Sequence, residues 1–192
     1  FDVTAKGYWE KNILNIACEN GNFEIAKYLI TLNKIDIKNL NNSQETILHL
    51  ACRSGNELLV KYIISLNVID ILSTNDSNQT ILHLAAKSKN LSLMNYLLKL
   101  NKLDVNAKDK NDNTILQIAI ENDNIELVKL LSKQKDIDFT VKDDDNANLL
   151  MHACETGNLE LVNFLLEQAQ FDLKAKDNKK RTVIHYACKS GK

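Results

Sequence analysis

The sequence repeats with a period of 34 residues, and no insertion or deletion breaks that period. The period is marked by an alanine and an aliphatic residue at Ala17, Ala51, Ala85, Ala119, Ala153 and Ala187, and at Leu14, Leu48, Leu82, Leu116, Leu150 and Ile184. It is also marked by an aspartate between apolar residues and by an asparagine, at Asp2, Asp36, Asp70, Asp104, Asp138 and Asp172, and at Asn22, Asn56, Asn90, Asn124 and Asn158. A unit of this length cannot bury its apolar face alone, so stacked units must share one continuous core.

Each repeat has the pattern of two helices followed by a long loop. In the second repeat Thr46 can cap a helix through its hydroxyl, and Leu48 and Ala51 then fall on one helical face. Gly55 can adopt the positive φ that ends this helix, and Asn56 can cap a second helix with its own apolar stripe. A short extended piece around each framework aspartate would let successive loops pair as β-hairpins.

The blocks TILHLAC, TILHLAA and TVIHYAC resemble the T-P-L-H-x-A signature of the ankyrin repeat family, GNFEIAKYLI and GNLELVNFLLE its second helix, and LDVNAKD its loop. The tetratricopeptide family has the same period, but its W-x-x-L-G-x-x-Y pattern is missing. The resemblance implies an all-α repeat solenoid of helix-turn-helix units with β-hairpin finger loops. We expect the tail of a preceding repeat at 1–6, repeats at 7–40, 41–74, 75–108, 109–142 and 143–176, and a truncated repeat at 177–192.

Some positions depart from the family pattern. The usual family period is 33, and the proline after the threonine is replaced here in every unit, which the fold tolerates because proline is favoured but not required at a first helical position. The fingertip turn glycine is replaced by residues that tolerate left-handed backbone at Asn78, Asp112 and Asn146, and by less suitable ones at Gln44 and Lys180. Lys89 and Asp123 replace the glycine between the two helices, which predicts strain in the third and fourth repeats.

The cysteines and histidines follow the repeat rather than a catalytic or metal-binding pattern. Cysteine fills one repeat position at Cys18, Cys52, Cys154 and Cys188, where Ala86 and Ile120 stand in the other units. A position that accepts Cys, Ala or Ile is an apolar packing site. Histidine fills another at His49, His83 and His185, where the family histidine hydrogen-bonds its own loop. The helical neighbours His49 and Cys52 lie four repeats from His185 and Cys188, too far for the two pairs to bind one zinc ion. We therefore predict structural roles, with no metal, no cofactor and no catalytic residue.

Three further features have ordinary explanations beside functional ones. His152 lies one residue beyond the histidine row; we favour a partly buried histidine with a hydrogen-bond partner over a pH-sensing role. The acidic run 143–145 lacks the calcium-loop pattern and is interpreted as a solvated fingertip. The basic run 179–181 is too short to be specific for nuclear import and falls in a finger loop.

The charge balance and hydropathy exclude two classes of partner. With 24 basic and 25 acidic side chains the net charge is −1, whereas a protein that binds nucleic acid through phosphates usually has a basic excess. No apolar run reaches the length of a membrane span. Because the cysteines follow packing positions rather than pairs, we expect free thiols and an intracellular, cytoplasmic location.

We therefore expect a non-catalytic scaffold, a monomer, that binds a partner protein through a concave face of fingers and first helices. Mapped by register, that face comprises Tyr8, Trp9, Asn42, Ser43, Glu45, Asp76, Ser77, Gln79, Lys110, Asn111, Asn113, Asp144 and Asp145 on the fingers, and Glu19, Arg53, Lys87, Glu121 and Glu155 on the first helices. These positions vary between repeats while the framework rows do not.

Three alternatives stay open. The array could be the targeting arm of a larger enzyme or effector whose catalytic domain lies outside this sequence, or a mechanical scaffold without a single partner. It could also be a substrate for asparagine hydroxylation, as the family sometimes is, which rests on Asn106 alone.

The two ends raise two more expectations. Tyr8 and Trp9 stand at a fingertip where other units place polar pairs, so they either bind a partner or pack on a repeat that precedes them. The last half-repeat stops where its second helix should begin, so Ile184, Ala187 and Cys188 are expected to lack a covering helix.

Overall fold

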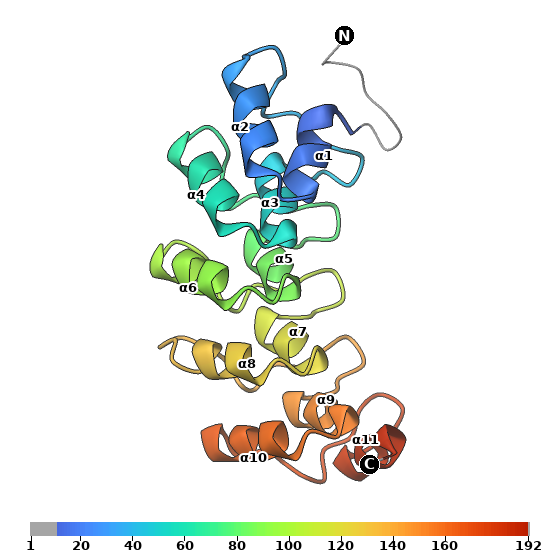
Figure 1. Cartoon of the computed structure of the whole chain (residues 1–192). Coiled ribbons are helices and arrows are strands. Elements are labelled where there is room, and N and C mark those ends of the chain that lie inside the picture. The colour runs from blue at the N-terminus through green and yellow to red at the C-terminus, as the bar shows by residue number, and fades with distance from the viewer. Residues whose placement is uncertain (1–10, 192) are drawn as a thin grey trace. The chain divides into compact units, whose positions relative to one another are not determined.

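The computed structural model describes residues 11–191, and the chain divides into two compact units, Phe1–Leu103 and Asp104–Lys192. In the first unit the described helices are α1 (Ile13–Glu19), α2 (Phe23–Thr31), α3 (Ile47–Ser54), α4 (Glu57–Ser65), α5 (Ile81–Lys87) and α6 (Leu91–Lys99) (Figure 1). In the second they are α7 (Ile115–Glu121), α8 (Ile125–Leu131), α9 (Leu149–Thr156), α10 (Leu159–Gln168) and α11 (Val183–Ser190). The expected tail at residues 1–6 lies outside the described residues.

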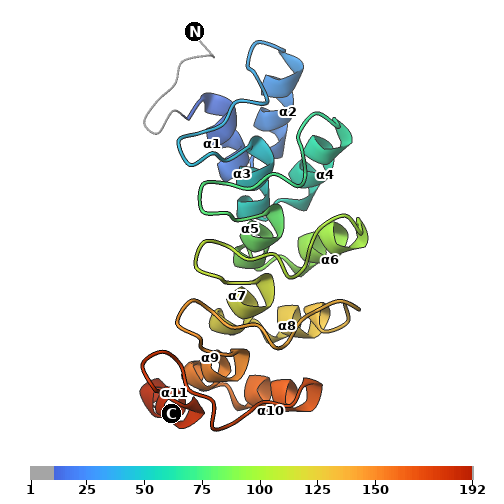
Figure 2. The same ribbon diagram turned by 180° about the vertical axis from the view of Figure 1, so that it is seen from behind.

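Each unit is built from helix pairs. In the first unit α1, α3 and α5 pack in series, and each contacts the second helix of its own repeat, α2, α4 or α6. In the second unit α7, α9 and α11 form the same kind of series, while α8 and α10 pack on α7 and α9. Figure 2 shows, within each unit, the long loops that lead from a second helix to the next first helix. The predicted helix-turn-helix repeats are confirmed.

The periodic aliphatic row forms the core. Its members Leu14, Leu48, Leu82, Leu116 and Leu150 are at most 2% exposed, so their identity across repeats reflects burial. Ile184, the last member, is 69% exposed, and Ala187 and Cys188 are exposed beside it. Within residues 11–191 no second helix follows α11, which explains why this part of the row is uncovered, as expected.

The threonine and histidine of the signature close the start of the first helix. The hydroxyl of Thr46 accepts a hydrogen bond from the backbone N–H of His49 (3.3 Å), and Nδ1 of His49 accepts one from the backbone N–H of Thr46 (3.2 Å). This reciprocal capping pairs two donors that the first helical turn leaves without partners. Burial lowers the pKa of the His49 imidazole, which favours the neutral form that the cap requires. The histidine row is structural, as predicted.

The asparagine row has two functions at once. The side-chain oxygen of Asn56 accepts from the backbone N–H of Leu59 (3.0 Å) and caps α4, while its amide nitrogen donates to the carbonyl of Gly21 in the preceding repeat (2.7 Å). Asn90 repeats this arrangement, with its amide nitrogen on the Gly55 carbonyl at 2.8 Å. The cap was predicted, whereas the bond between repeats was not.

The framework aspartates form turns, which corrects the expectation of extended pieces and β-hairpins. The carboxylate of Asp36 accepts the backbone N–H of Lys38 two residues later, at 2.9 Å. The other described members do the same at 2.7–2.9 Å: Asp70, Asp104, Asp138 and Asp172. Because the side chain takes a backbone donor, it favours a turn over a β-ladder. Residues 11–191 contain no strand; an isolated antiparallel bridge joins Lys142 and Asn148.

The turn positions that depart from glycine keep the left-handed backbone. The fingertip residues Gln44, Asn78, Asp112, Asn146 and Lys180 have φ values of 56°, 57°, 59°, 63° and 62°. Between the helices, Lys89 and Asp123 have φ values of 58° and 52°, where Gly55 has 76°. A side chain in this region costs roughly 1–2 kcal/mol, so the prediction of strain at Lys89 and Asp123 is supported by their backbone geometry.

The last finger is held by the buried carboxylate of Asp177. One oxygen accepts from Nε of Arg181 (2.6 Å) and from the hydroxyl of Tyr186 (2.8 Å), and the other accepts from the backbone N–H groups of Lys179 (2.9 Å) and Arg181 (2.7 Å). Burial raises the pKa of the Asp177 carboxyl, but these hydrogen bonds and the Arg181 charge outweigh it and lower that pKa to about 2.

Thiol accessibility should follow the repeat. All four cysteines are free; Cys18 and Cys52 are buried, Cys154 is partly buried and Cys188 is exposed. Burial raises the pKa of the Cys18 thiol to about 12, and reaction requires the thiolate. In native protein Cys188 should react first with an aromatic disulfide reagent, and Cys18 and Cys52 only on unfolding. Rapid native modification of Cys52, located by mass spectrometry, would contradict the packing role.

Relief of the backbone strain should stabilise the first unit. Lys89→Gly removes a side chain from a left-handed residue, and the gain is reduced by the greater freedom of glycine in the unfolded chain, so we expect about 0.5–1 kcal/mol. Gly55→Ala is the matched opposite: its Cβ would lie 3.1 Å from Cβ of Ser88. In denaturant unfolding, the midpoint of Lys89→Gly should be higher than that of the parent chain, and the midpoint of Gly55→Ala should be lower. Equal midpoints for all three proteins would refute this account of the strain.

Acid should weaken the last finger through Asp177. Its folded pKa of about 2 lies below the ordinary value of 3.8, so the stabilisation is complete above pH 4 and lost as the pH falls from about 4 to 2. Asp177→Asn keeps a backbone acceptor, as Asn41 and Asn75 do at this repeat position, but loses the charge. Amide exchange of α11 should be faster in this variant at pH 6 and converge with the parent near pH 2. Asp144→Asn, at an exposed fingertip, is the control and should leave exchange unchanged.

Candidate functional site

The residues predicted to bind a partner differ in exposure. Those exposed are Asn42, Asp76, Ser77, Lys87, Lys110, Asn111, Glu121 and Asp144. Those partly exposed are Glu19, Ser43, Arg53, Gln79, Asn113, Asp145 and Glu155. Glu45 is buried, and Tyr8 and Trp9 lie outside the described residues. The fingertips and the ends of the first helices thus supply most of the accessible positions.

A further row of residues, which sequence reasoning missed, holds the fingers in shape. The side-chain oxygen of Asn41 accepts the backbone N–H groups of Ser43 (3.0 Å) and Glu45 (2.9 Å). The equivalent residues Asn75, Asp109, Asp143 and Asp177 accept in the same way. Neighbouring fingers are also joined, because the backbone N–H of Asp76 donates to the carbonyl of Ser43 at 2.9 Å. An Asn or Asp at a constant 34-residue interval was the available signal.

An ion network occupies the finger and first-helix face of the first unit. The Arg53 guanidinium contacts the carboxylate of Glu45 through both terminal nitrogens, one of them at 3.3 Å, and lies 4.0 Å from Glu19. Lys11 pairs with Glu19 at 2.6 Å. Glu45 is only 3% exposed, which corrects the expectation that it lies on the surface. The charge of Arg53 is therefore compensated by carboxylates of the same unit and is less available to a binding partner.

The Glu45 carboxyl is ionised in this network. Burial raises its pKa, but hydrogen bonds from Asn41 and Arg53, the Arg53 charge and a hydrogen bond from Asn75 outweigh burial and leave the pKa below its ordinary value. A buried carboxylate needs such partners, because an unpaired charge is strongly penalised away from water. Glu45 thus differs between repeats for a reason internal to the chain.

In the second unit His152 lies between two carboxylates. Its Nε2 is 3.0 Å from an oxygen of Asp143 and 3.2 Å from the amide nitrogen of Gln117, and its Nδ1 is 3.4 Å from an oxygen of Glu121. The ring packs edge-on to Tyr186 with centroids 6.2 Å apart, and the side chain is 12% exposed. The expectation of a partly buried histidine with hydrogen-bond partners is confirmed.

The acidic run is less solvated than predicted. Asp143 has a side chain only 12% exposed, because it holds its own finger and contacts His152. Asp145 pairs with Lys179 of the next finger at 2.7 Å and with Arg181 at 3.9 Å. Only Asp144 is fully exposed. Of the basic run, Lys179 and Arg181 are thus engaged by aspartates.

A pocket of about 340 Å3 opens on the first helices of the second unit, lined by Glu121, His152, Glu155 and Thr156. Glu155 forms an ion pair with Lys189. Glu121 has no lysine or arginine ion pair within residues 11–191 and contacts only the polar groups of His152 and Gln117 there. The pocket therefore has negative character and could receive the cationic end of a basic side chain.

Two features of the described part of the chain concern metal binding and membrane crossing. Among residues 11–191 no group of three or more His, Cys, Asp or Glu side chains is arranged to hold a metal ion. No helix in that range is long and apolar enough to cross a membrane.

Comparison with solved structures shows the fold. One similar chain belongs to the complex of the Bd0816 predatory endopeptidase from Bdellovibrio bacteriovorus with the immunity protein Bd3460, at 24% identity and a TM-score of 0.77, covering 97% of this chain and 94% of the other. Another is the ankyrin repeat domain of Bcl-3, a member of the IkappaB protein family, at 24% identity and a TM-score of 0.74, covering 95% and 81%. No curated protein matches the sequence.

The family model for ankyrin repeats, which describes three copies, matches residues 1–75, 59–143 and 136–192 and so spans the whole chain. This match agrees with the capped helix pairs, the structural histidine row and the finger turns described above. The chain belongs to the ankyrin repeat family.

Proposed function

We propose that this chain is a non-catalytic module that binds a partner protein through its fingertips and first helices. Ankyrin repeats are protein-interaction modules, and one similar chain belongs to a complex of an endopeptidase with an immunity protein. The balanced charge supports a protein partner over nucleic acid. The free cysteines support an intracellular, cytoplasmic location, and we propose that the module acts as a monomer.

The observation that carries this proposal is the contrast between rows of repeat positions. The aliphatic row that ends in Ile184 is nearly constant and otherwise buried. By contrast, the fingertip row has Asn42, Asp76, Lys110 and Asp144, all exposed. Residues that differ from repeat to repeat, lie at the surface and have no core to fill are free to match a partner.

The accessible charges suggest part of the partner chemistry. Lys87 is exposed on α5 of the first unit, and Glu121 is exposed on α7 of the second. The pocket at Glu121, His152 and Glu155 suits a lysine or arginine side chain of the partner. Arg53, which is compensated by Glu45 and Glu19, contributes less than its sequence position suggested.

Exchange of these two charges should weaken the partner complex. The partner would first be captured from source-cell extract on the immobilised chain, identified by mass spectrometry and purified. The double variant Lys87→Glu, Glu121→Lys keeps the net charge but reverses both surface charges, so we expect at least about a tenfold loss in affinity by calorimetry. Added salt should narrow the difference, because exposed charges are screened.

The matched control is Lys99→Glu, Glu167→Lys, which exchanges two exposed charges on the second helices α6 and α10. It should bind as the parent chain does, and both double variants should melt within a few degrees of it. If the control variant loses affinity and the first variant does not, the partner contacts the second helices and the proposed face is wrong.

A further inference from the structure

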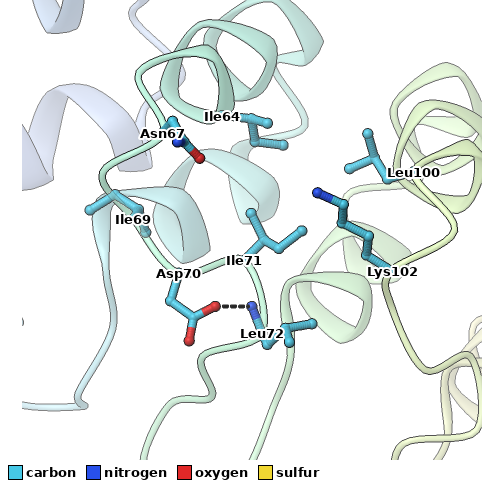
Figure 3. A pocket seen from close by; sticks show the side chains of 8 residues that line it. All are labelled: Ile64, Asn67, Ile69, Asp70, Ile71, Leu72, Leu100 and Lys102. Carbon is cyan, nitrogen blue, oxygen red and sulfur yellow. Dashed lines mark hydrogen bonds between the residues drawn. The ribbon is translucent and has the colours of Figure 1, made fainter.

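A second cavity lies in the first unit, away from the fingers. It has a volume of about 630 Å3 and is lined by the end of α4, the loop that follows it, and the segment after α6: Ile64, Asn67, Ile69, Asp70, Ile71, Leu72, Leu100 and Lys102 (Figure 3). Pockets for small molecules usually measure about 300–1,000 Å3 and combine apolar walls with a few polar groups. None of the lining residues belongs to the predicted partner-binding face.

The walls are aliphatic and one cation is available. Figure 3 shows the side chain of Lys102 reaching toward Ile64 and Ile71 across the cavity. Lys102 forms no ion pair within residues 11–191. The other charged lining residue, Asp70, keeps its negative charge, but its carboxylate accepts the backbone N–H of Leu72 at 2.9 Å and is directed away from the end of Lys102 (Figure 3). The cavity thus joins an apolar wall to an ammonium group that no carboxylate pairs with in the described residues.

Leu72 is exceptional at its repeat position. The equivalent residues are polar in every other repeat: Lys38, Asn106, Thr140 and Lys174. The Leu72 side chain is 59% exposed although it lines the cavity, so it is an apolar group left partly in water.

In the second unit Asn106 shows what an amide can do at this position, whereas the Thr140 hydroxyl bonds locally to Asp138. The amide nitrogen of Asn106 donates to the carbonyl of Asp136 (2.6 Å), and its side-chain oxygen accepts from the backbone N–H of Asp138 (3.0 Å). These two bonds tie the Asn106 loop to the next one. The residue equivalent to Asp136, one repeat earlier, is Lys102, which lines the cavity.

The local backbone is the same in both places. The N–H of Asn106 donates to Asp104 at 2.8 Å, just as the N–H of Leu72 donates to Asp70 at 2.9 Å. Leu72 therefore occupies the position from which the Asn106 amide bonds to the next loop, but its side chain has no hydrogen-bond donor or acceptor. Without such bonds, which we call the clamp, an apolar opening remains with Lys102 at its edge.

We propose that this cavity binds a free aliphatic carboxylate of medium chain length. The hydrocarbon chain lies against Ile64, Ile71, Leu72 and Leu100, and the carboxylate pairs with Lys102. Burial of the chain removes apolar surface from water, and the charged hydrogen bond at Lys102 orients the ligand. The site is independent of the partner-binding face.

The direct test titrates isotope-labelled chain with octanoate and follows the backbone amide resonances. We expect shifts confined to residues 64–72 and 100–102, and a dissociation constant that falls about threefold for each methylene from hexanoate to decanoate. No localised shift at millimolar octanoate would overturn the proposal. Octanol and octylammonium have the same hydrocarbon chain without the carboxylate. If either binds as tightly as octanoate, Lys102 does not recognise the carboxylate.

Three variants separate the contributions. Leu72→Asn introduces the clamp seen at Asn106 and should reduce octanoate affinity at least tenfold. Leu58→Asn makes the same chemical change at a leucine 65% exposed on α4 outside the cavity, and should bind normally. Lys102→Gln should weaken octanoate binding severalfold and leave octanol binding unchanged. If Leu72→Asn fails to fold by circular dichroism, the Lys102→Gln comparison still decides; octanoate binding unaffected by Lys102→Gln would refute the proposed site.

Discussion

In the first unit, one asparagine side chain per repeat couples the start of a helix to the stacking of two repeats through a backbone carbonyl, and in the second unit Asn158 makes the equivalent bond to the Asp123 carboxylate. Asn90 caps α6 by accepting the N–H of Leu93 at 3.0 Å, and the same amide donates to the Gly55 carbonyl at 2.8 Å. Two backbone groups are satisfied by one side chain, in a place where an unpaired group would cost about 1–3 kcal/mol. An aspartate could make the cap but has no N–H to donate, so the asparagine recurs wherever both bonds are needed. The left-handed residue Gly55, with a φ of 76°, lies in the turn whose carbonyl accepts this bond.

Local features of the fold could be predicted from the sequence, and features between repeats could not. The cap at Thr46 and the positive φ at Asn78 depend on residues within four positions, and both were predicted correctly. The burial of Glu45 depends on Arg53, eight residues later, and on Asn75, thirty residues later. A period marks which residues are equivalent but gives no distances between neighbouring units, so a finger carboxylate was assigned to the surface. The turn at Asp36 was missed for a different reason, because flanking apolar residues resemble a short strand when the side chain's own hydrogen bond is ignored.

Variation between repeats has two sources, and only one concerns a partner. Glu45 differs from its equivalents because Arg53 is its counter-ion, and Arg181 differs because it pairs with Asp177. Such residues vary together as internal sets, and their side chains are already engaged. Exposed positions such as Asp76 and Lys110 vary without a core to fill, so variation is informative about recognition at the fingertips and less so at the finger bases. The pocket at Glu121 is intermediate, because His152 replaces an aliphatic residue of the repeat and contacts Asp143, which belongs to the regular finger row.

Leu72 and Asn106 show how the side chain at one loop position decides whether two neighbouring loops are tied together or leave a cavity. The aspartate turn shapes the backbone in the same way at both positions, so the side chain alone decides whether adjacent loops are tied or left apart. The first unit does not depend on a clamp at this position, because the asparagine bonds and the buried aliphatic row hold its repeats together. The opening is lined by residues that already belong to the repeat, such as Ile71 and Leu100. The cavity at Leu72 therefore leaves the helices undisturbed, since the contacts that specify the helices lie in other rows.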